Sequence, residues 1–442
     1  MSAMTVTGDR GPAGRDIDEL PRLPGHPVAG SALALRRDAL GVLDRARCLG
    51  EVVRLNLGPP RFGTTVVGFF SPPGVQEVLT CRDPRLGKSG QYWDEIARWL
   101  GHGLLTSDGP NWAGQRRMVS PMFAHAQLDS WQAALEQEAE RMAEELATVA
   151  PTTLDLSPPA VRLALRAISR TVFGTDNTAA AAALHDGIGR GSQQMLRRAN
   201  SPLRLPWRFP TPRQVPARRG FARTFAVADG LIAARRAQPG DDLVSLLLAA
   251  RDDTGTPLDP REVREQAVLF LVAGHETTAI GVATAMHQLA ARPDLQDAVA
   301  DDLDLSRRVF LETIRLWPPA YWTSRTTRAE MVLGGYRLPT GTIAMVSPWV
   351  THRDPALWAD PQRFDPDRFT GDQVKVRPKG TYFPFGLGPQ NCIGDRFATI
   401  EATLALSAVC RRVRLSDPHG PAHRTLGLTM RPVGLTARIT PR

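Results

Sequence analysis

The residue whose type and setting could most directly do chemistry is Cys392, in a Gly-rich segment that runs into a strong helical pattern. A thiol at a helix N-terminus faces the positive end of the helix dipole and unpaired N–H groups, which favour the thiolate. Gly388 allows a tight turn, and Gly394 lets the backbone approach a flat, bulky group. Phe385 is placed to cover the sulfur. A buried cysteine in a turn is the alternative that Cys-x-Gly alone would favour.

A second set of polar side chains interrupts a long apolar segment, LFLVAGHETTAIGVATAMHQLA (269–290). Gly274 costs about 1 kcal/mol relative to alanine inside a helix, and Glu276 places a carboxyl among apolar residues. Such local violations are expected at functional sites. The alternative is structural, because Thr277 and Thr278 could each hydrogen-bond to a carbonyl four residues earlier.

Two further pairs have helical spacing. Glu312 and Arg315 are three residues apart and therefore share one helix face. Trp112 and Arg116 are four residues apart. Taken alone, the first pair is typical of a surface ion pair, and the second of a core tryptophan beside a solvated arginine.

Three near matches to known motifs fail at a required position. His275–Ala279 begins like a zinc-protease helix, but alanine stands where the second metal-binding histidine is needed. Gly87–Ser89 is similar to the end of a phosphate-binding loop, but Arg82 occupies its first glycine. Residues 386–391 start like a dinucleotide fingerprint and lack its third glycine. These departures argue against zinc-protease, NTPase and Rossmann functions.

The composition is that of an ordinary globular protein, with 42% apolar and 22% charged residues in a chain of 442. The net charge is +9, and only 3 of the 54 basic residues are lysine. This arginine excess is either a compositional bias or a basic face for an acidic partner. Nucleic-acid binding is disfavoured, because no basic run is interleaved with aromatic residues. The four cysteines are scattered without a CxxC pair, as expected for reduced thiols in the cytoplasm.

The N-terminal segment has no apolar core of the kind found in signal peptides and membrane anchors. The longest apolar run, 267–274, is too short to span a bilayer. We expect residues 1–18 to be flexible and residues 19–442 to form a single domain.

The pattern of apolar residues predicts a mainly α fold with a minor β region. Alternating or β-branched residues at 51–58 and 64–70 predict a small sheet. Helical patterns dominate from about residue 111 to residue 300, apart from a basic, Pro-rich break at 197–219. Further β fragments follow residue 320.

Phe385, Gly388, Cys392 and Gly394 form the string Phe-x-x-Gly-x-x-x-Cys-x-Gly, which resembles the heme-binding loop of the cytochrome P450 family. The resemblance implies that the chain binds heme b, iron protoporphyrin IX, with the Cys392 thiolate as the axial metal ligand. Gln390 departs from the pattern, because the family usually has an arginine or histidine there that contacts a heme propionate. A charge-assisted hydrogen bond worth about 1.5–3 kcal/mol thereby becomes a neutral one.

The segment Ala273–Thr278 resembles the distal helix of the same family. There an acid–alcohol pair, here Glu276 and Thr277, orders water and delivers protons to dioxygen, the co-substrate. By the same resemblance, Ala273 and Gly274 leave room for the oxygen.

Glu312 and Arg315 resemble the family's Glu-x-x-Arg helix, with Arg368 completing a buried triad that braces the cysteine loop. Three further residues match common contacts to the heme propionates: Trp112, Arg116 and Arg325. The resemblance extends from about residue 20 to the C-terminus.

The resemblance implies a triangular helical prism and a monooxygenase that inserts one atom of dioxygen into a small apolar organic substrate. The chain shows neither a reductase extension nor iron–sulfur spacing. We therefore expect electrons from a ferredoxin and its ferredoxin reductase, with the arginine excess forming the docking face. We also expect a cytoplasmic monomer with no membrane anchor and no nucleic-acid partner.

The substrate is where the sequence leaves alternatives open. The segments expected to line the pocket are 91–104, 197–219, Ala273, 320–323 and 426–430. Their aromatic and aliphatic side chains favour a bulky apolar molecule, and we expect a polyketide, macrolactam or terpenoid intermediate. A fatty acid or a steroid is the second choice. A peroxide-driven peroxygenase and a non-catalytic heme-binding sensor are alternative functions, and a basic nucleic-acid binder is the most distant one.

Overall fold

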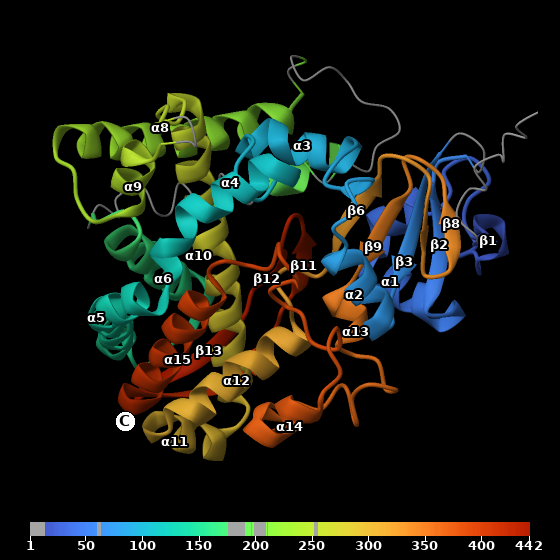
Figure 1. Ribbon diagram of the computed structural model, residues 1–442. Coiled ribbons are helices and arrows are strands. Elements are labelled where there is room, and N and C mark those ends of the chain that lie inside the picture. The colour runs from blue at the N-terminus through green and yellow to red at the C-terminus, as the bar shows by residue number, and fades with distance from the viewer. Residues whose placement is uncertain are drawn as a thin grey trace, which may run out of the picture.

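The computed structural model describes residues 14–59, 63–175, 191–195, 197–198, 209, 211–251 and 255–442. Helices fill one side of the molecule and most strands lie on the other (Figure 1). The helices are α1 (Ala32–Leu49), α2 (Pro72–Thr80), α3 (Gln91–Leu100), α4 (Gly109–Val119), α5 (His125–Val149), α6 (Ser157–Thr171), α8 (Gln214–Ala237), α9 (Leu243–Ala249), α10 (Pro260–Ala290), α11 (Pro293–Asp301), α12 (Leu303–Leu316), α13 (Pro348–Thr351), α14 (Gly371–Val376) and α15 (Asp395–Arg412). The mainly α class predicted from the sequence is confirmed.

The largest sheet has five strands in the order β2-β3-β9-β6-β4 and joins segments from both halves of the chain. Its members are β2 (Val52–Leu57), β3 (Thr64–Phe69), β4 (Leu86–Gly87), β6 (Thr323–Thr327) and β9 (Ile343–Val346). β2 pairs antiparallel with β3, as the sequence predicts, and β3 pairs parallel with β9. β6 pairs antiparallel with β9 on one side and with β4 on the other.

The remaining strands form three small sheets, in which β8 pairs with β1 and β7, β13 pairs with β10 and β5, and β11 pairs with β12. Their bounds are β1 (Arg15–Asp16), β5 (Thr152–Asp155), β7 (Met331–Leu333), β8 (Tyr336–Leu338), β10 (Val413–His419), β11 (His423–Leu426), β12 (Met430–Val433) and β13 (Thr436–Pro441). Short 3-10 helices occupy Ile17–Glu19, Ser120–Phe123 and Pro366–Phe369.

Helix α10 runs through the middle of the helical part (Figure 1). A capping box starts it: the Asp259 carboxylate accepts from the Arg261 N–H at 2.7 Å, and the Glu262 carboxylate accepts from the Asp259 N–H at 3.3 Å. Among the described helices, α10 alone is long and apolar enough to cross a membrane, yet 83% of that apolar window is buried. The apolar surface of α10 is therefore used by packing against α6, α8, α12 and α15.

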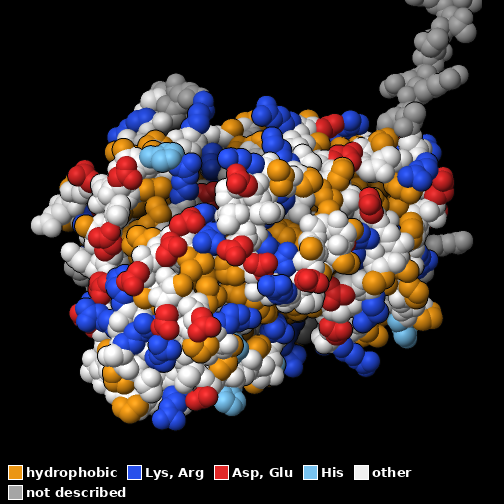
Figure 2. Space-filling view, turned by 90° about the horizontal axis from the view of Figure 1, so that it is seen from below, with side chains coloured by type: hydrophobic (Ala, Val, Ile, Leu, Met, Phe, Trp, Pro, Cys, Tyr) orange, Lys and Arg blue, Asp and Glu red, His pale blue; other side chains and the backbone are white. Residues whose placement is uncertain are grey.

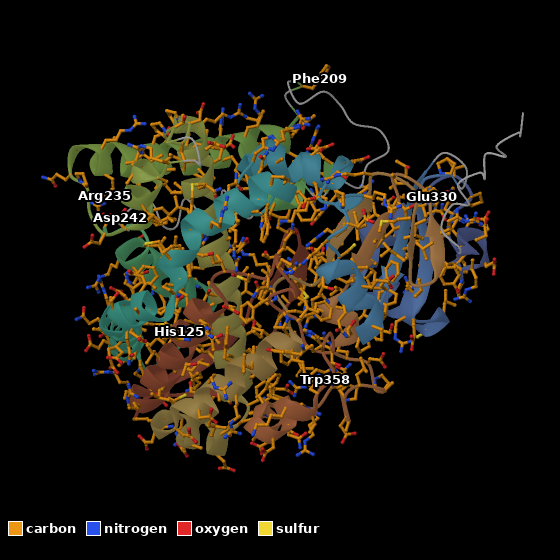
Figure 3. The ribbon with its side chains drawn as sticks, in the orientation of Figure 1. His125, Phe209, Arg235, Asp242, Glu330 and Trp358 are labelled. Carbon is orange, nitrogen blue, oxygen red and sulfur yellow. The ribbon has the colours of Figure 1, made fainter. Side chains whose placement is uncertain are left out.

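Carboxylate side chains stabilise two of the junctions between helices. Arg235 near the end of α8 reaches Asp242, which also caps α9 by accepting from the Ser245 N–H at 3.0 Å (Figure 3). Between α11 and α12, Asp302 accepts from the Leu305 N–H at 2.9 Å and caps α12.

Two boundaries differ from the sequence prediction. Residues 1–13 lie outside the described chain, but residues 14–18, expected to be flexible, include β1, which pairs with β8, and the buried Ile17. The Pro-rich break expected at 197–219 lies partly outside the described residues, and its last part is already helical because α8 begins at Gln214.

Candidate functional site

The cysteine loop, residues 383–394, folds back on itself directly ahead of α15. The Cys392 N–H donates to the Phe385 carbonyl at 2.7 Å. Gly388 has a φ of +75°, and a Cβ there would lie 2.8 Å from the Leu79 carbonyl oxygen of α2. Backbone conformation and close packing therefore both require glycine at this turn. The Phe385 ring is half-buried against the helical core.

The Cys392 thiol faces open space and yet is largely surrounded by protein. Its side chain is exposed, and a Cβ built on Gly394 would meet no atom within 4 Å. Desolvation by the surrounding protein raises the pKa of the thiol to about 11, although a hydrogen bond from the Gly394 N–H and the charge of Arg116 lower it. A thiol with this pKa is neutral at pH 7 and becomes a thiolate when a metal ion binds it.

One face of α10 is open at the point where the apolar pattern breaks. Ala273 is exposed and Thr277 is half-buried, whereas Thr278 is buried. The Thr277 hydroxyl donates to the Ala273 carbonyl at 3.0 Å, and the Thr278 hydroxyl donates to the Gly274 carbonyl at 3.3 Å. Both threonines therefore make the backbone bonds of the structural alternative, and Thr277 also presents its hydroxyl on the open face.

Glu276 follows the same helix but lies in different surroundings. Its side chain is 2% exposed, and Oε1 has no hydrogen-bond partner among the described residues. Burial raises the pKa of the carboxyl, against the charge of Arg431 and a hydrogen bond with the Thr429 side chain. The carboxyl thus points toward the strand β12, while Thr277 faces the open side of α10.

Gly274 has a packing role that the sequence does not reveal. A Cβ there would lie 2.0 Å from Ile168 Cδ1. Glycine therefore lets α10 pack closely on α6. Ala273 is the more exposed of the two residues, and the expectation that both leave room for the oxygen stays a prediction.

Gln390 links a cation to a carboxylate beside the cysteine loop. Its Oε1 accepts from Arg325 Nη2 at 2.8 Å, and its Nε2 donates to Asp108 Oδ1 at 3.0 Å. An amide can do both because it carries an acceptor and a donor, whereas an arginine would face Arg325 with a like charge. Glutamine in place of the usual arginine or histidine at position 390 therefore suits its two neighbours, Arg325 and Asp108.

Lys88 belongs to this region and was missed by the sequence reasoning. Burial, and next the charge of Arg325, lower its pKa to about 7. Its backbone N–H donates to Asp108 Oδ2 at 2.7 Å, and its ammonium lies 5.6 Å from the Trp93 ring centroid. The available signal was that this lysine, one of three in the chain, stands in the failed phosphate-loop string.

Positive charge is in surplus around the loop. Arg116 Nη1 donates to the Asn391 carbonyl at 3.0 Å, and Trp112, one turn earlier on α4, packs on the helical core. Four cations here interact with two carboxylates: Lys88, Arg116, Arg325 and Arg328 with Asp108 and Asp395. A flat group with two carboxylates, lying against Cys392, would balance this charge, so the residues fit heme b.

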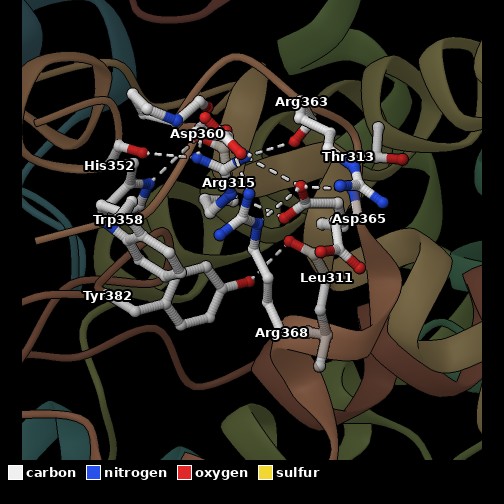
Figure 4. A network of polar contacts seen from close by, with 12 residues as sticks. Leu311, Thr313, Arg315, His352, Trp358, Asp360, Arg363, Asp365, Arg368 and Tyr382 are labelled. Carbon is white, nitrogen blue, oxygen red and sulfur yellow. Dashed lines mark hydrogen bonds and ion pairs between the residues drawn. The ribbon is translucent and has the colours of Figure 1, made fainter. Parts of the chain in front are cut away.

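Glu312 and Arg315 form a fully buried ion pair on α12. Figure 4 shows the polar contacts around Arg315. Arg315 Nε and Nη2 donate to the two Glu312 oxygens at 2.6 and 2.8 Å. Arg368 Nε lies 3.6 Å from Glu312 Oε1. The structure therefore brings together the three residues of the expected triad.

The same network reaches the cysteine loop through His352. Arg315 Nη1 donates to the His352 carbonyl at 2.7 Å, and His352 Nε2 accepts from the Phe383 N–H at 3.0 Å. Burial lowers the pKa of His352 well below its usual range, so the ring is neutral and can accept this bond. The ion pair on α12 is thus connected by two hydrogen bonds to the start of the loop that carries Cys392.

The cysteine loop, the open face of α10 and the buried ion pair occur together in a chain whose residues 21–435 match the family model for cytochrome P450. The chain belongs to the cytochrome P450 family. This P450 is 34% identical to cyclooctat-9-en-7-ol 5-monooxygenase from Streptomyces melanosporofaciens, over 89% of each chain. It is 29% identical to pentalenene oxygenase from Streptomyces avermitilis, over 94% of each chain. A crystal structure of a six-coordinated cytochrome P450 from Thermus thermophilus superposes with a TM-score of 0.76 at 27% identity, covering 95% of this chain and 100% of that one.

Membership settles the fold and the class of reaction. The fold is that of cytochrome P450, and the enzyme is a P450 monooxygenase. The family implies a heme with a cysteine thiolate ligand and the use of dioxygen, and its members typically use redox partners and small apolar substrates.

Proposed function

We propose that this P450 oxidises a terpenoid intermediate, with Cys392 as the thiolate ligand of heme b. The observation that carries the ligand assignment is the cysteine loop, with its exposed thiol beside a surplus of positive charge. Heme, when bound, supplies the activation of dioxygen and the oxygen transfer. Phe385 and Gly394 flank the sulfur, and Gly394 leaves space for the flat ring.

The cationic residues hold the propionate side of the heme in this proposal. They are Lys88, Arg116 and Arg325, assisted by Trp112 and Gln390. Charge-assisted hydrogen bonds to carboxylates are about twice as strong as neutral ones, and they gain further strength in a desolvated site. Gln390 contributes by orienting Arg325 rather than by a charge of its own.

Thr277 and Glu276 divide the handling of protons. The Thr277 hydroxyl lies on the open face of α10 next to Ala273, where it can hold a water molecule or the oxygen substrate. Glu276, whose pKa is raised by burial, stores the proton behind it. Because the two side chains face different ways, transfer between them needs a bridging water or a rotamer change at Glu276.

The relatives favour terpenoids among the substrates considered. The names of the two Streptomyces proteins are those of terpenoid oxygenases, and the match spans nearly their whole length. A fatty acid or a steroid is the second choice. A ferredoxin with its reductase supplies the electrons to a cytoplasmic, monomeric enzyme.

The ligand assignment is tested by Cys392→Ala, with Cys48→Ala on the exposed part of α1 as the matched control. The reduced carbon monoxide complex of the wild type and the control should show the red-shifted band of thiolate-ligated heme. Cys392→Ala should lack it. An unchanged band in Cys392→Ala would refute the assignment. Turnover of cyclic terpenes with ferredoxin, its reductase and NADPH then separates an enzyme from a heme sensor.

A further inference from the structure

A hollow of about 550 Å³ opens between α1, the five-stranded sheet, α3 and β11. This volume is typical of a site for a small organic molecule. Its walls are largely apolar and include Leu43, Leu55, Val66, Met345, Trp322 and Leu426. None of the described residues that line it belongs to the cysteine loop or to α10.

Five arginines and a single acidic residue line this hollow among the described residues. The arginines come from four separate segments: Arg36 and Arg37 from α1, Arg197, Arg213 at the start of α8, and Arg424 from β11. They share one solvent-exposed rim over an apolar floor. The fold thus gathers guanidinium groups that are far apart in the sequence.

The three arginines Arg36, Arg197 and Arg213 are close enough to repel one another. Burial, then the charges of Arg213 and Arg36, lower the pKa of Arg197. No described carboxylate forms an ion pair with any of these three side chains. Gathering like charges without a counter-charge costs free energy, which an anion bound between them would offset.

The one acid that lines the hollow is already engaged. Asp38 has non-helical backbone angles and interrupts α1. Its Oδ1 accepts from the Gly41 N–H at 2.9 Å, and its Oδ2 lies 3.6 Å from Arg45. Asp38 therefore serves the second half of α1 as a cap and leaves the neighbouring arginines unbalanced.

The type of cation and the helix end both favour an oxyanion. Guanidinium groups bind carboxylate and phosphate through pairs of parallel hydrogen bonds, which ammonium groups cannot form. Arg213 is also the N-cap residue of α8, directly before Gln214, so the positive end of a 24-residue helix adds to the same rim.

The apolar wall leads from this rim toward the heme side. Trp322 packs both on the apolar core below the hollow and on the core that contains Leu269–Val272 of α10. Its ring centroid lies 4.6 Å from that of Tyr92, and the strand that follows it carries Arg325. A molecule with its charged end at the rim would therefore place its apolar body along Trp322.

We infer that three arginines of this rim, Arg36, Arg197 and Arg213, bind the oxyanion end of an otherwise apolar substrate. The oxyanion is a carboxylate or a phosphate ester, and the carbon that is oxidised lies far from it. This inference rests on the proposed function in one respect, namely that the bound molecule is the substrate of the heme site.

The test is calorimetric titration of the heme-loaded enzyme with matched pairs of probes. Farnesoic acid is compared with farnesol, and dodecanoic acid with dodecanol. Farnesyl phosphate and inorganic phosphate form two further arms. The acids should bind on the order of tenfold more tightly than the alcohols, as expected for one lost charge-assisted contact. This advantage should shrink as salt is added, because the rim is exposed to solvent.

Variants assign the effect to the rim. Arg197→Gln and Arg213→Gln should each remove most of the preference for the acid, and Arg213→Lys should restore part of it. Arg236→Gln, at the exposed far end of the same helix α8, is the matched control and should keep the full preference.

Each outcome decides the inference. Equal affinities for acid and alcohol, or an unchanged preference in both rim variants, would overturn it. Inorganic phosphate binding as tightly as farnesyl phosphate would identify a site for free phosphate and would equally overturn it. If farnesyl phosphate binds much more tightly than farnesoic acid, the natural oxyanion is a phosphate ester. If farnesoic acid binds more tightly, it is a carboxylate. The carbon monoxide spectrum of each variant reports the heme ligand independently. Failure of this inference can therefore be distinguished from failure of the proposed function.

Discussion

At the scale of single residues, two adjacent threonines on α10 differ in role: one only bonds to the backbone, and the other is also placed to take part in chemistry. Thr277 and Thr278 make the same hydrogen bond to a carbonyl four residues earlier. Only Thr277 also reaches the open face, because Thr278 is 2% exposed. The sequence could not distinguish these roles, since both residues satisfy the same local pattern.

Thr277→Ala should therefore divert reducing equivalents into hydrogen peroxide, because it removes the hydroxyl that, in the proposed function, holds the proton donor near the oxygen. The expected change is a severalfold rise in peroxide formed per NADPH consumed. Thr278→Ala removes an equal backbone bond from the buried side and should leave this ratio near that of the wild type. Product and peroxide are measured in the same reconstituted assay. Equal peroxide yields from both variants would remove Thr277 from the handling of protons.

Lys88 shows how a residue becomes functional through its surroundings. Its folded-state pKa is about 7 and lies below the usual lysine value of 10.5 even with Asp108 nearby, so without a further anion it loses its proton near neutral pH. A heme propionate binds best to the protonated form. The part of the heme affinity that Lys88 supplies should accordingly fall as the pH rises through about 7, whereas the proton that Cys392 releases on binding iron adds an opposite trend that does not depend on Lys88.

The measurement is a heme titration of the apoprotein at pH 6 and pH 8. Compared with the wild type at the same pH, Lys88→Gln should bind heme on the order of tenfold more weakly at pH 6, and this deficit should be smaller at pH 8. Lys375→Gln, at an exposed lysine paired with Asp372 on the surface, is the control and should behave as the wild type. A ratio of wild-type to Lys88→Gln heme affinity that is the same at pH 6 and pH 8 would contradict the role of this lysine.

At the scale of elements, the sequence predicted those whose patterns are local. The hairpin of β2 and β3 and the long helix α10 follow from alternation and from a continuous apolar run. The contacts that position the side chains of the site are non-local and could not be predicted from local sequence patterns. Gly274 faces Ile168 of α6, and Gln390 is explained only by Asp108 and Arg325, which lie far away along the chain.

The connection from α12 to the cysteine loop is such a non-local arrangement. Because Glu312 and Arg315 are both fully buried, removing one leaves the other as an uncompensated charge. Such losses cost about 3–5 kcal/mol in stability. Arg315→Ala also removes the hydrogen bond to the His352 carbonyl, and His352 holds Phe383 at the start of the loop.

We therefore expect Arg315→Ala to yield protein with little heme and a lowered unfolding temperature. Arg307→Ala, on the exposed side of the same helix, should retain both. Heme content per protein and circular dichroism measure the two effects separately. A normal heme content in Arg315→Ala would show that the loop does not depend on this network.

At the scale of the whole molecule, the net charge of +9 is a poor guide to partners, because many arginines are paired internally. Arg411 and Arg412 both bind Glu140, and Arg414 and Arg442 both bind Asp297. Acidic and basic side chains are interspersed over the face shown in Figure 2. The surplus instead matters locally, beside the cysteine loop and at the rim of the hollow.

A carboxyl group buried in the core, that of Glu401, lowers the stability of the whole fold when it is ionised. Glu401 on α15 is 1% exposed, and neither carboxylate oxygen has a hydrogen-bond partner among the described residues. Burial raises the pKa of Glu401 from 4.5 to about 8. Between these pH values the folded state binds a proton that the unfolded state has released, so the contribution to stability is complete below pH 4.5 and is lost as the pH rises through 8.

Glu401→Gln removes this proton linkage and keeps the shape of the side chain. Its unfolding temperature relative to the wild type should rise steadily from pH 5 to pH 8, corresponding to about 1.4 kcal/mol per pH unit, and should level off above pH 8. Any free-energy cost of burying the new amide is independent of pH. The test is therefore the slope, against pH, of the difference in unfolding temperature between the variant and the wild type. Glu330→Gln, at an exposed position on the sheet side (Figure 3), should give a flat difference over the same range. A flat difference for Glu401→Gln as well would mean that Glu401 is ionised in the core at neutral pH, which would require a cationic partner that the described residues do not supply.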